Sequence, residues 1–283
     1  MAGVQSIARR IKDLGAFDLV IVDEAHTIPR SSDTLYGKLF AGLREMNPHV
    51  RVIGLTATPY RLDSGRLDQG EDALFGGIAY DIPIGMLVER GHLAPLISKR
   101  PGMVFDLKGL HTRMGDYIEK ELSDRFATDE ITRAAVAEIV TLGADRRAWI
   151  AFCISVEHAH AVAAEMRKHG ITTETVTGAT PKDARARILR DYKAGRIRAL
   201  TSVGVLTTGF DAPATDLLAF LRPTKSTGLY IQMAGRGMRP SPGKENCLVL
   251  DFAGNVARHG PVDAISLPDA KTGTGTGEAP TKT

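Results

Sequence analysis

Apolar residues along the chain fall into short continuous runs that alternate with segments of helical spacing. The clearest runs cover residues 17–22, 50–55, 148–154 and 247–252. Continuous apolar runs of about four to eight residues are typical of strands that are buried on both faces of a parallel sheet. Residues 35–46, between the first two runs, instead have the spacing of an amphipathic helix. This alternation predicts an α/β fold with mainly parallel sheets.

The alternation starts a second time near Asp129 and predicts a second lobe. Further strands are expected over residues 78–84, 173–176, 198–203 and 217–221, and further helices over residues 84–90, 131–142, 156–169, 181–194 and 227–239. Between residues 93 and 126, prolines and glycines interrupt any period, which indicates a connection. We therefore expect a partial first lobe (1–105), a connecting segment (106–128), a second lobe (129–262) and a disordered threonine- and glycine-rich tail (263–283).

Composition adds that the protein is globular and that its charge is nearly balanced. Of its 283 residues, 43% are hydrophobic and 24% are charged, and the formal net charge is +3. Nucleic-acid binding would therefore depend on local patches. The two cysteines occur singly inside apolar runs, which excludes a cysteine-based zinc framework. Because the sequence shows neither a long apolar run nor a secretion signal, we expect a cytoplasmic protein without a membrane partner.

Candidate chemistry begins where the first apolar run ends, at Asp23-Glu24-Ala25-His26. An acidic pair at a strand end suits a hydrated Mg²⁺ ion at Asp23 and a general base at Glu24. The second run ends in Thr56-Ala57-Thr58, and the carboxyl ends of parallel strands meet at one edge. We therefore expect His26 to hydrogen-bond to Thr56 or Thr58. An acidic pair alone is more often a solvated strand end. The Ala-His that follows it and the second strand that ends in Thr56-Ala57-Thr58 make the functional interpretation the favoured one.

A second candidate segment lies in the predicted helix of residues 227–239. Gln232, Arg236 and Arg239 are spaced i, i+4 and i+7, so a helix would place all three on one side. Two planar, permanently charged guanidinium groups on one stripe suit phosphate oxygens. The alternative is an amphipathic surface helix with solvated arginines. Gly235 and Gly237 argue against a helix selected for stability alone, because glycine lowers helix propensity.

Taken in order, these segments resemble the motifs of superfamily 2 helicases. DEAH at 23–26, TATP at 56–59, TTGFD at 207–211 and QMAGRGMR at 232–239 are similar to motifs II, III, V and VI. The segments LRPTKSTGLYIQMAGRGMRP and CLVLDFAGNVARHGPVD resemble the bacterial RadD-like helicases in particular. The resemblance extends over residues 3–263. It implies two RecA-like lobes that bind ATP between them and a nucleic-acid strand across their tops.

The resemblance also assigns roles to individual residues. Asp23 would hold Mg²⁺, Glu24 would act as the general base, and Arg236 and Arg239 would meet the phosphates of ATP. Catalysis would also involve His26 and Gln232, interlobe coupling would involve Thr56 and Thr58, and nucleotide binding would involve Gly209 and Asp211. Nucleic-acid contacts are implied for Gln5, Ser6, Ser155, Thr177, Gly178, Thr207 and Thr208. For each of these last residues taken alone, capping a helix is the more common role.

One expected element is missing from the sequence. The family's glycine-rich phosphate loop ends in Gly-Lys-Thr or Gly-Lys-Ser, whereas Gly37-Lys38 and Gly243-Lys244 are followed by leucine and glutamate. We therefore expect an N-terminal truncation, a split gene or a fragment of a longer sequence. In a split gene, a separately encoded N-terminal part would carry the loop. This chain alone should hydrolyse little ATP.

The function that the resemblance implies is ATP hydrolysis coupled to unwinding or remodelling of DNA, in DNA repair for the RadD-like group. RNA stays an alternative to DNA. A different class of function is a non-catalytic nucleic-acid-binding protein, or a split-enzyme partner that supplies the arginine-bearing lobe. A helicase-like subunit of a restriction or repair complex would share every one of these motifs.

Overall fold

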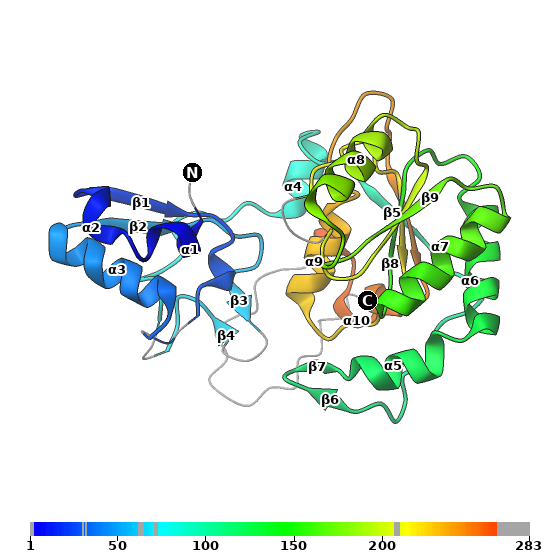
Figure 1. Ribbon diagram of the computed structural model, residues 1–283, viewed down its shortest axis with the longest axis horizontal. Coiled ribbons are helices and arrows are strands. Elements are labelled where there is room, and N and C mark those ends of the chain that lie inside the picture. Colours follow the sequence, from blue (N-terminus) through cyan, green and yellow to red (C-terminus); the bar gives the residue numbers. More distant parts are fainter. Residues whose placement is uncertain are drawn as a thin grey trace. The chain divides into compact units, whose positions relative to one another are not determined.

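The computed structural model of the protein divides into two compact units, residues 1–81 and residues 82–283. It describes residues 3–29, 31, 33–61, 65–70, 73–206 and 210–264. No helix in these ranges is long and apolar enough to cross a membrane. The predicted mixed α/β class with parallel sheets is confirmed (Figure 1).

The first unit is built around a two-stranded parallel sheet. Its helices are α1 (Val4–Ile7), α2 (Ile11–Leu14), η1 (Ala25–Thr27) and α3 (Leu35–Met46), and its strands are β1 (Leu19–Val22), β2 (Arg51–Gly54), β3 (Tyr60–Arg61) and β4 (Gly65–Arg66). β1 pairs with β2, and β3 pairs antiparallel with β4. Thr34 caps the N-terminus of α3, because its side chain accepts a hydrogen bond from the Gly37 amide. The buried face of α3 carries Leu39 and Leu43. The predicted helix of residues 35–46 is confirmed to the residue.

One face of the β1–β2 sheet is apolar and open to solvent. Side chains alternate along strands, and Ile21 lies beside Ile53 in the parallel register. Five large apolar side chains on this face are 43% to 59% exposed, and we call them together the open face: Phe17, Leu19, Ile21, Ile53 and Leu55. Parallel sheets normally have both faces covered, so an apolar open face is the unusual feature of this unit.

The second unit contains a six-stranded parallel sheet in the order β5-β12-β11-β8-β10-β9. Its strands are β5 (Leu96–Lys99), β8 (Trp149–Phe152), β9 (Thr173–Val176), β10 (Ala199–Ser202), β11 (Leu217–Phe220) and β12 (Cys247–Asp251), beside an antiparallel hairpin of β6 (Thr112–Arg113) and β7 (Asp116–Tyr117). Its helices are α4 (Ile84–Glu89), α5 (Glu119–Phe126), α6 (Asp129–Leu142), α7 (Val156–Lys168), α8 (Lys182–Lys193), α9 (Thr227–Gly235), α10 (Asn255–His259) and η2 (Val262–Ala264).

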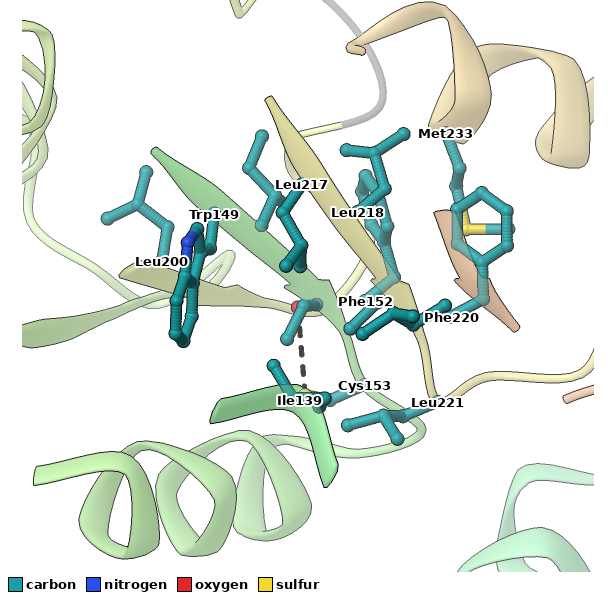
Figure 2. Packing of buried hydrophobic residues seen from close by; sticks show 14 of the residues in the cluster. Ile139, Trp149, Phe152, Cys153, Leu200, Leu217, Leu218, Phe220, Leu221 and Met233 are labelled. Carbon is teal, nitrogen blue, oxygen red and sulfur yellow. Dashed lines mark hydrogen bonds between the residues drawn. The ribbon is translucent and has the colours of Figure 1, made fainter. Parts of the chain in front are cut away.

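The core of the second unit explains the continuous apolar runs. Every residue of β8, β10, β11 and β12 is buried, because helices cover both faces of the central strands. Figure 2 shows Trp149, Phe152 and Leu217 among the side chains packed in this core. Cys153 and Cys247 are buried free thiols, as their isolation in the sequence predicted.

Two expectations about the middle of the chain differ from the structure. No strand forms over residues 78–83, and the first element there is α4, which ends before Gly91 as predicted. Residues 96–99, expected to end the first lobe, form β5 and pair with β12 of the second sheet. The division between the units therefore falls after Asp81 and not at residue 105. Of the tail predicted to be disordered, residues 265–283 lie outside the described residues.

Candidate functional site

In the first unit, the two strand ends that carry the acidic and threonine motifs are held side by side by the backbone. The Leu55 amide donates to the Val22 carbonyl at 2.8 Å, and the Ala25 amide donates to the Leu55 carbonyl at 2.9 Å. Gly54 permits this approach, because a Cβ atom there would lie 2.7 Å from the Cβ of Ala25. The acidic turn therefore lies directly against the end of β2.

The predicted contact between the two motifs is confirmed. His26 Nδ1 lies 2.9 Å from Thr56 Oγ1, which also accepts a hydrogen bond from the Thr58 amide at 3.0 Å. The same nitrogen lies 3.4 Å from Glu24 Oε2. His26 therefore links the acidic turn to the Thr56–Thr58 turn, with Thr58 participating through its backbone while its side chain is buried.

Glu24 has a left-handed backbone, with φ 51° and ψ 46°. Few residues other than glycine adopt this conformation, and such outliers gather at functional sites. Two local hydrogen bonds support it: Asp23 Oδ1 accepts from the Glu24 amide at 2.9 Å, and the Glu24 carbonyl accepts from Thr27 Oγ1 at 2.8 Å. The turn leaves the side chain of Asp23 exposed to solvent.

The acidic turn fits a nucleotide-bound Mg²⁺ ion and not a closed metal site. Within the described ranges, no group of three or more histidine, cysteine, aspartate or glutamate side chains could hold a metal. Mg²⁺ in nucleotide sites is bound through one or two carboxylates together with phosphate oxygens and water. One exposed aspartate, Asp23, matches that requirement.

The residues implied in nucleic-acid binding have different surroundings. Gln5 and Ser6 are exposed on α1. Ser155 follows β8, is buried, and caps α7 by accepting a hydrogen bond from the His158 amide at 3.2 Å. The common structural role therefore applies to Ser155.

Thr177 and Gly178 follow β9 at the same carboxyl edge of the sheet as Ser155. The Thr177 amide donates to Thr180 Oγ1 at 2.9 Å, and Arg185 Nη2 donates to the Thr177 carbonyl at 2.8 Å. These bonds shape the turn, and Gly178 is exposed at its tip. Thr207, Thr208 and Gly209, the other predicted motif V contacts, lie outside the described residues.

The arginine segment departs from the predicted single helix of residues 227–239. α9 ends at Gly235, and Arg236 occupies its C-terminal cap. The chain then turns against β12, where a Cβ atom at Gly237 would lie 2.5 Å from Cys247 Sγ. Gln232 is half-buried on α9, and Arg239 lies beyond the helix, so the three residues do not form one helical stripe.

The two arginines nevertheless converge on one point of motif V. Arg236 Nη1 and Arg239 Nη1 both donate to the Phe210 carbonyl, the latter at 2.6 Å. Arg239 Nη1 also pairs with Asp211 Oδ1 at 2.8 Å. The turn after α9 therefore places the two guanidinium groups together, whereas the predicted helix was expected to place Gln232 on the same side as well.

Lys244 fastens this turn and was missed as a site residue. Its Nζ donates to the carbonyls of Gly237 at 2.7 Å, Arg239 at 2.8 Å and Pro213 at 3.0 Å. Burial lowers the pKa of this ammonium group. In the sequence, Lys244 drew attention only as part of Gly243-Lys244, which is excluded as a phosphate loop. No local pattern in the sequence indicates the three carbonyl groups that Lys244 contacts.

A buried polar network at the other end of α9 was also missed. Asn255 Oδ1 accepts from the Thr224 amide at 3.0 Å, and His259 Nε2 lies 2.9 Å from the Thr224 carbonyl. His259 Nδ1 lies 3.2 Å from Thr227 Oγ1 in the first turn of α9. Ser226 Oγ caps that turn by accepting from the Leu229 amide at 3.1 Å. The two segments in which the sequence analysis found a resemblance to RadD-like helicases therefore meet in space, and this resemblance is the one sequence signal that could have indicated the network.

Comparison with known proteins agrees with these motifs. Residues 132–241 match the family described as the helicase conserved C-terminal domain, and residues 2–61 match the type III restriction enzyme, res subunit. IRC3 of Saccharomyces cerevisiae, named as an ATP-dependent helicase, is 28% identical over 259 residues, which cover 90% of this chain and 37% of that protein. The irc3 protein of Schizosaccharomyces pombe, named as a mitochondrial ATP-dependent helicase, is 32% identical over 86% of this chain and 39% of its own length.

A solved structure shares the fold. A fragment of an HsdR subunit of a type I restriction enzyme from Vibrio vulnificus superimposes with a TM-score of 0.67 at 23% identity, over 89% of this chain and 47% of that one. This chain spans less than half the length of each of these three relatives. Together with the motifs described above, the matches show that the chain belongs to the superfamily 2 helicases.

Proposed function

We propose that this chain is the motor portion of an ATP-dependent DNA helicase or translocase. The observation that carries the proposal is the His26–Thr56 hydrogen bond, which connects an acidic turn suited to ATP hydrolysis with the motif III turn. The match of residues 2–61 to the type III restriction enzyme, res subunit, favours DNA as the partner. The RadD-like segments favour a role in DNA repair.

In this proposal the acidic turn carries the hydrolytic chemistry. Glu24 accepts the proton of the attacking water, and Asp23 would hold Mg²⁺, which neutralises phosphate charge when ATP is bound. His26 lies within hydrogen-bond reach of both Glu24 and Thr56, so it responds to changes at either residue. Thr56 and Thr58 carry that response into the motif III turn.

Arg236 and Arg239 stabilise the charge that develops on the transferred phosphoryl group. Both already donate to a single oxygen, the Phe210 carbonyl, so their guanidinium groups are placed for one acceptor group. A phosphate can replace that carbonyl as the acceptor, since arginine recognises both through the same N–H donors. Gln232 and Asp211, together with Gly209, would complete the nucleotide contacts.

DNA contacts are proposed at the carboxyl edge of the second sheet and on α1. Exposed backbone and small polar side chains suit phosphate oxygens and position a strand without reading its sequence. Gly178 and Thr177 meet this description, whereas Ser155 contributes through the α7 N-terminus that it caps. Gln5 and Ser6, with Thr207 and Thr208, are the remaining proposed contacts.

An ATPase assay with forked and single-stranded DNA tests the assignments. Because the sequence lacks a phosphate loop, the chain alone should show little Mg²⁺-dependent turnover, and adding a polypeptide that carries the loop should raise it. Glu24→Gln should abolish the restored activity, while Glu45→Gln, an exposed glutamate on α3, should not change it. Robust turnover by the chain alone that Glu24→Gln removes would contradict the requirement for a separate loop.

The arginine assignment has its own control. Arg236→Ala with Arg239→Ala should lower the restored rate by about 10³-fold or more, the usual contribution of an arginine finger. Arg187→Ala, on the exposed side of α8, should leave the rate unchanged. Full activity in the double variant would exclude the finger role.

The open face favours a second candidate function, in which the chain is one part of a split enzyme. Among the described residues, both edges of the two-stranded sheet are unpaired, and five exposed apolar side chains lie on its strands or directly beside them. A further α/β polypeptide would cover both the edges and the side chains. We propose that this polypeptide carries the phosphate loop. Ile21→Ser with Ile53→Ser should then prevent its binding in size-exclusion chromatography. Binding that survives both substitutions would place the partner elsewhere.

A further inference from the structure

The β6–β7 hairpin ends in an unusual turn. Arg113 pairs with Asp116 across it, so the turn consists of Met114 and Gly115 only. Both residues have positive φ, 53° and 83°. A two-residue hairpin with two positive φ angles is a type I′ turn, for which asparagine-glycine is the preferred sequence. Met114 occupies the asparagine position, and its side chain is 92% exposed.

Folding stability does not account for this methionine. A large side chain strains a backbone in the left-handed region. Because the Met114 side chain is exposed to water, no burial of apolar surface offsets that strain. Asparagine at position 114 would relieve the strain without exposing apolar surface. A local outlier of this kind, on a well-supported element, indicates a function for the side chain.

The strand that follows the turn is firmly attached to the body of the second unit. Asp116 Oδ2 accepts from Thr224 Oγ1, and Asp116 Oδ1 accepts from the Lys225 amide, both at 2.8 Å. The Tyr117 ring lies 5.3 Å from Lys225 Nζ and 5.4 Å from the Arg258 guanidinium carbon. Because Thr224 follows β11, these contacts fix the hairpin to the carboxyl edge of the sheet, the edge of the proposed DNA contacts.

The preceding strand is attached to α5. The His111 amide donates to Glu121 Oε2 at 2.8 Å, and His111 Nδ1 lies 3.1 Å from Glu121 Oε1. The hairpin therefore presents its tip on two supported strands (Figure 1). Arg113, beside the tip, and Lys225, at the base, are both exposed cations.

We propose that this hairpin contacts the nucleic acid at the junction between duplex and single strand, with Met114 packed on an unpaired base and Arg113 on a neighbouring phosphate. Methionine is one of the apolar side chains that wedge against bases, and arginine neutralises phosphates. The inference rests on the proposed function, because it assumes that nucleic acid crosses this edge.

A nucleic-acid partner fits the tip better than a protein partner does. Specific protein interfaces cover about 800 Å² on each side and have an apolar centre. The tip offers one apolar side chain among Thr112, Arg113 and Gly115. One apolar contact beside one cation matches the alternation of base and phosphate along a strand.

The test uses the full chain and forked DNA that carries 2-aminopurine at the junction, with binding measured by fluorescence anisotropy. Met114→Asn is the decisive variant, because asparagine favours the turn and the variant should fold at least as stably as the wild type. It should abolish the increase in 2-aminopurine fluorescence and weaken fork binding by about tenfold, about 1.4 kcal/mol. Met114→Leu should preserve both signals. Met86→Gln, at an exposed methionine on α4, is the matched control and should change neither.

The outcomes separate this inference from the proposed function. If Met114→Asn binds forks and raises the fluorescence as the wild type does, the hairpin inference is overturned while DNA binding stands. If the wild-type chain binds neither forked nor single-stranded DNA, the proposed DNA contacts are overturned and the hairpin role with them. Loss of the junction signal with unchanged affinity for single-stranded DNA supports the inference.

Discussion

Replacing Lys244 tests whether the turn that carries the arginines is held by one buried ammonium group. In Lys244→Met the chain keeps a side chain of similar length but loses three hydrogen bonds, to the carbonyls of Gly237, Arg239 and Pro213. A hydrogen bond from a charged donor contributes about 1.5–3 kcal/mol net. Three such bonds set an upper limit of about 9 kcal/mol, and two opposing effects reduce it.

The first opposing effect is the burial of the ammonium group, which lowers the pKa of Lys244 and is relieved by methionine. The second is that three acceptors sharing one donor are not additive. We therefore expect the free energy of unfolding to fall by about 2–4 kcal/mol, which is large for a single surface-proximal substitution.

Trp149 is the only tryptophan of the chain and is buried in β8, so its fluorescence reports unfolding of the second unit alone. With a urea dependence of about 2–3 kcal/mol per molar, Lys244→Met should lower the unfolding midpoint by about 0.7–2 M. Lys193→Met, at the exposed end of α8, should shift it by less than about 0.25 M, since surface substitutions cost about 0.5 kcal/mol or less. Equal midpoints for the two variants would refute the reasoning.

Two further predictions concern the same unit. Gly237→Ala should destabilise it by about 1–3 kcal/mol, because the new Cβ would lie 2.5 Å from Cys247 Sγ, whereas Gly235→Ala meets nothing within 4 Å and should be neutral or stabilising in the same urea titration. Burial lowers the pKa of His158 from 6.5 to about 4, so the unfolded chain binds the proton first. The free energy of unfolding should then fall by about 3 kcal/mol as the pH decreases from 6.5 to 4, and urea titrations of His158→Gln should lack this contribution; an identical pH dependence in both proteins would contradict it.

The sequence predicted the elements of the second unit well because their signals are local. Strands buried on both faces are continuously apolar, and β8, β11 and β12 lie within the predicted runs 148–154, 217–221 and 247–252. The helix after β9 begins at Lys182, one residue after its predicted start, with Pro181 at its N-cap. Burial and backbone geometry both produce patterns within about ten residues of sequence, and hydrophobic periodicity detects such patterns.

Features set by distant partners could not be predicted in this way. β5 is mostly exposed and lies between prolines, and only its pairing with β12, about 150 residues away, makes it a strand. The end of α9 at Gly235 depends on the close approach of Gly237 to Cys247 in β12. Lys244 finds all three of its acceptors in the turns around the arginines. None of these partners has a fixed spacing in the sequence.

The candidate site could be predicted in part. Family motifs indicate contacts between residues that are far apart in the sequence, which local patterns do not. His26 and Thr56 are 30 residues apart and form the expected hydrogen bond, and Arg239 reaches Asp211 across 28 residues. In both places, a side chain from one motif contacts the segment that carries another motif. This arrangement makes each motif sensitive to movement of its partner, which the proposed coupling of ATP hydrolysis to movement on DNA would require. The His26–Thr56 hydrogen bond lies within the first unit, and the contacts of Arg236 and Arg239 with Phe210 lie within the second unit. A substitution at either place should therefore change the conformation of its own unit, and any change in turnover should follow from that.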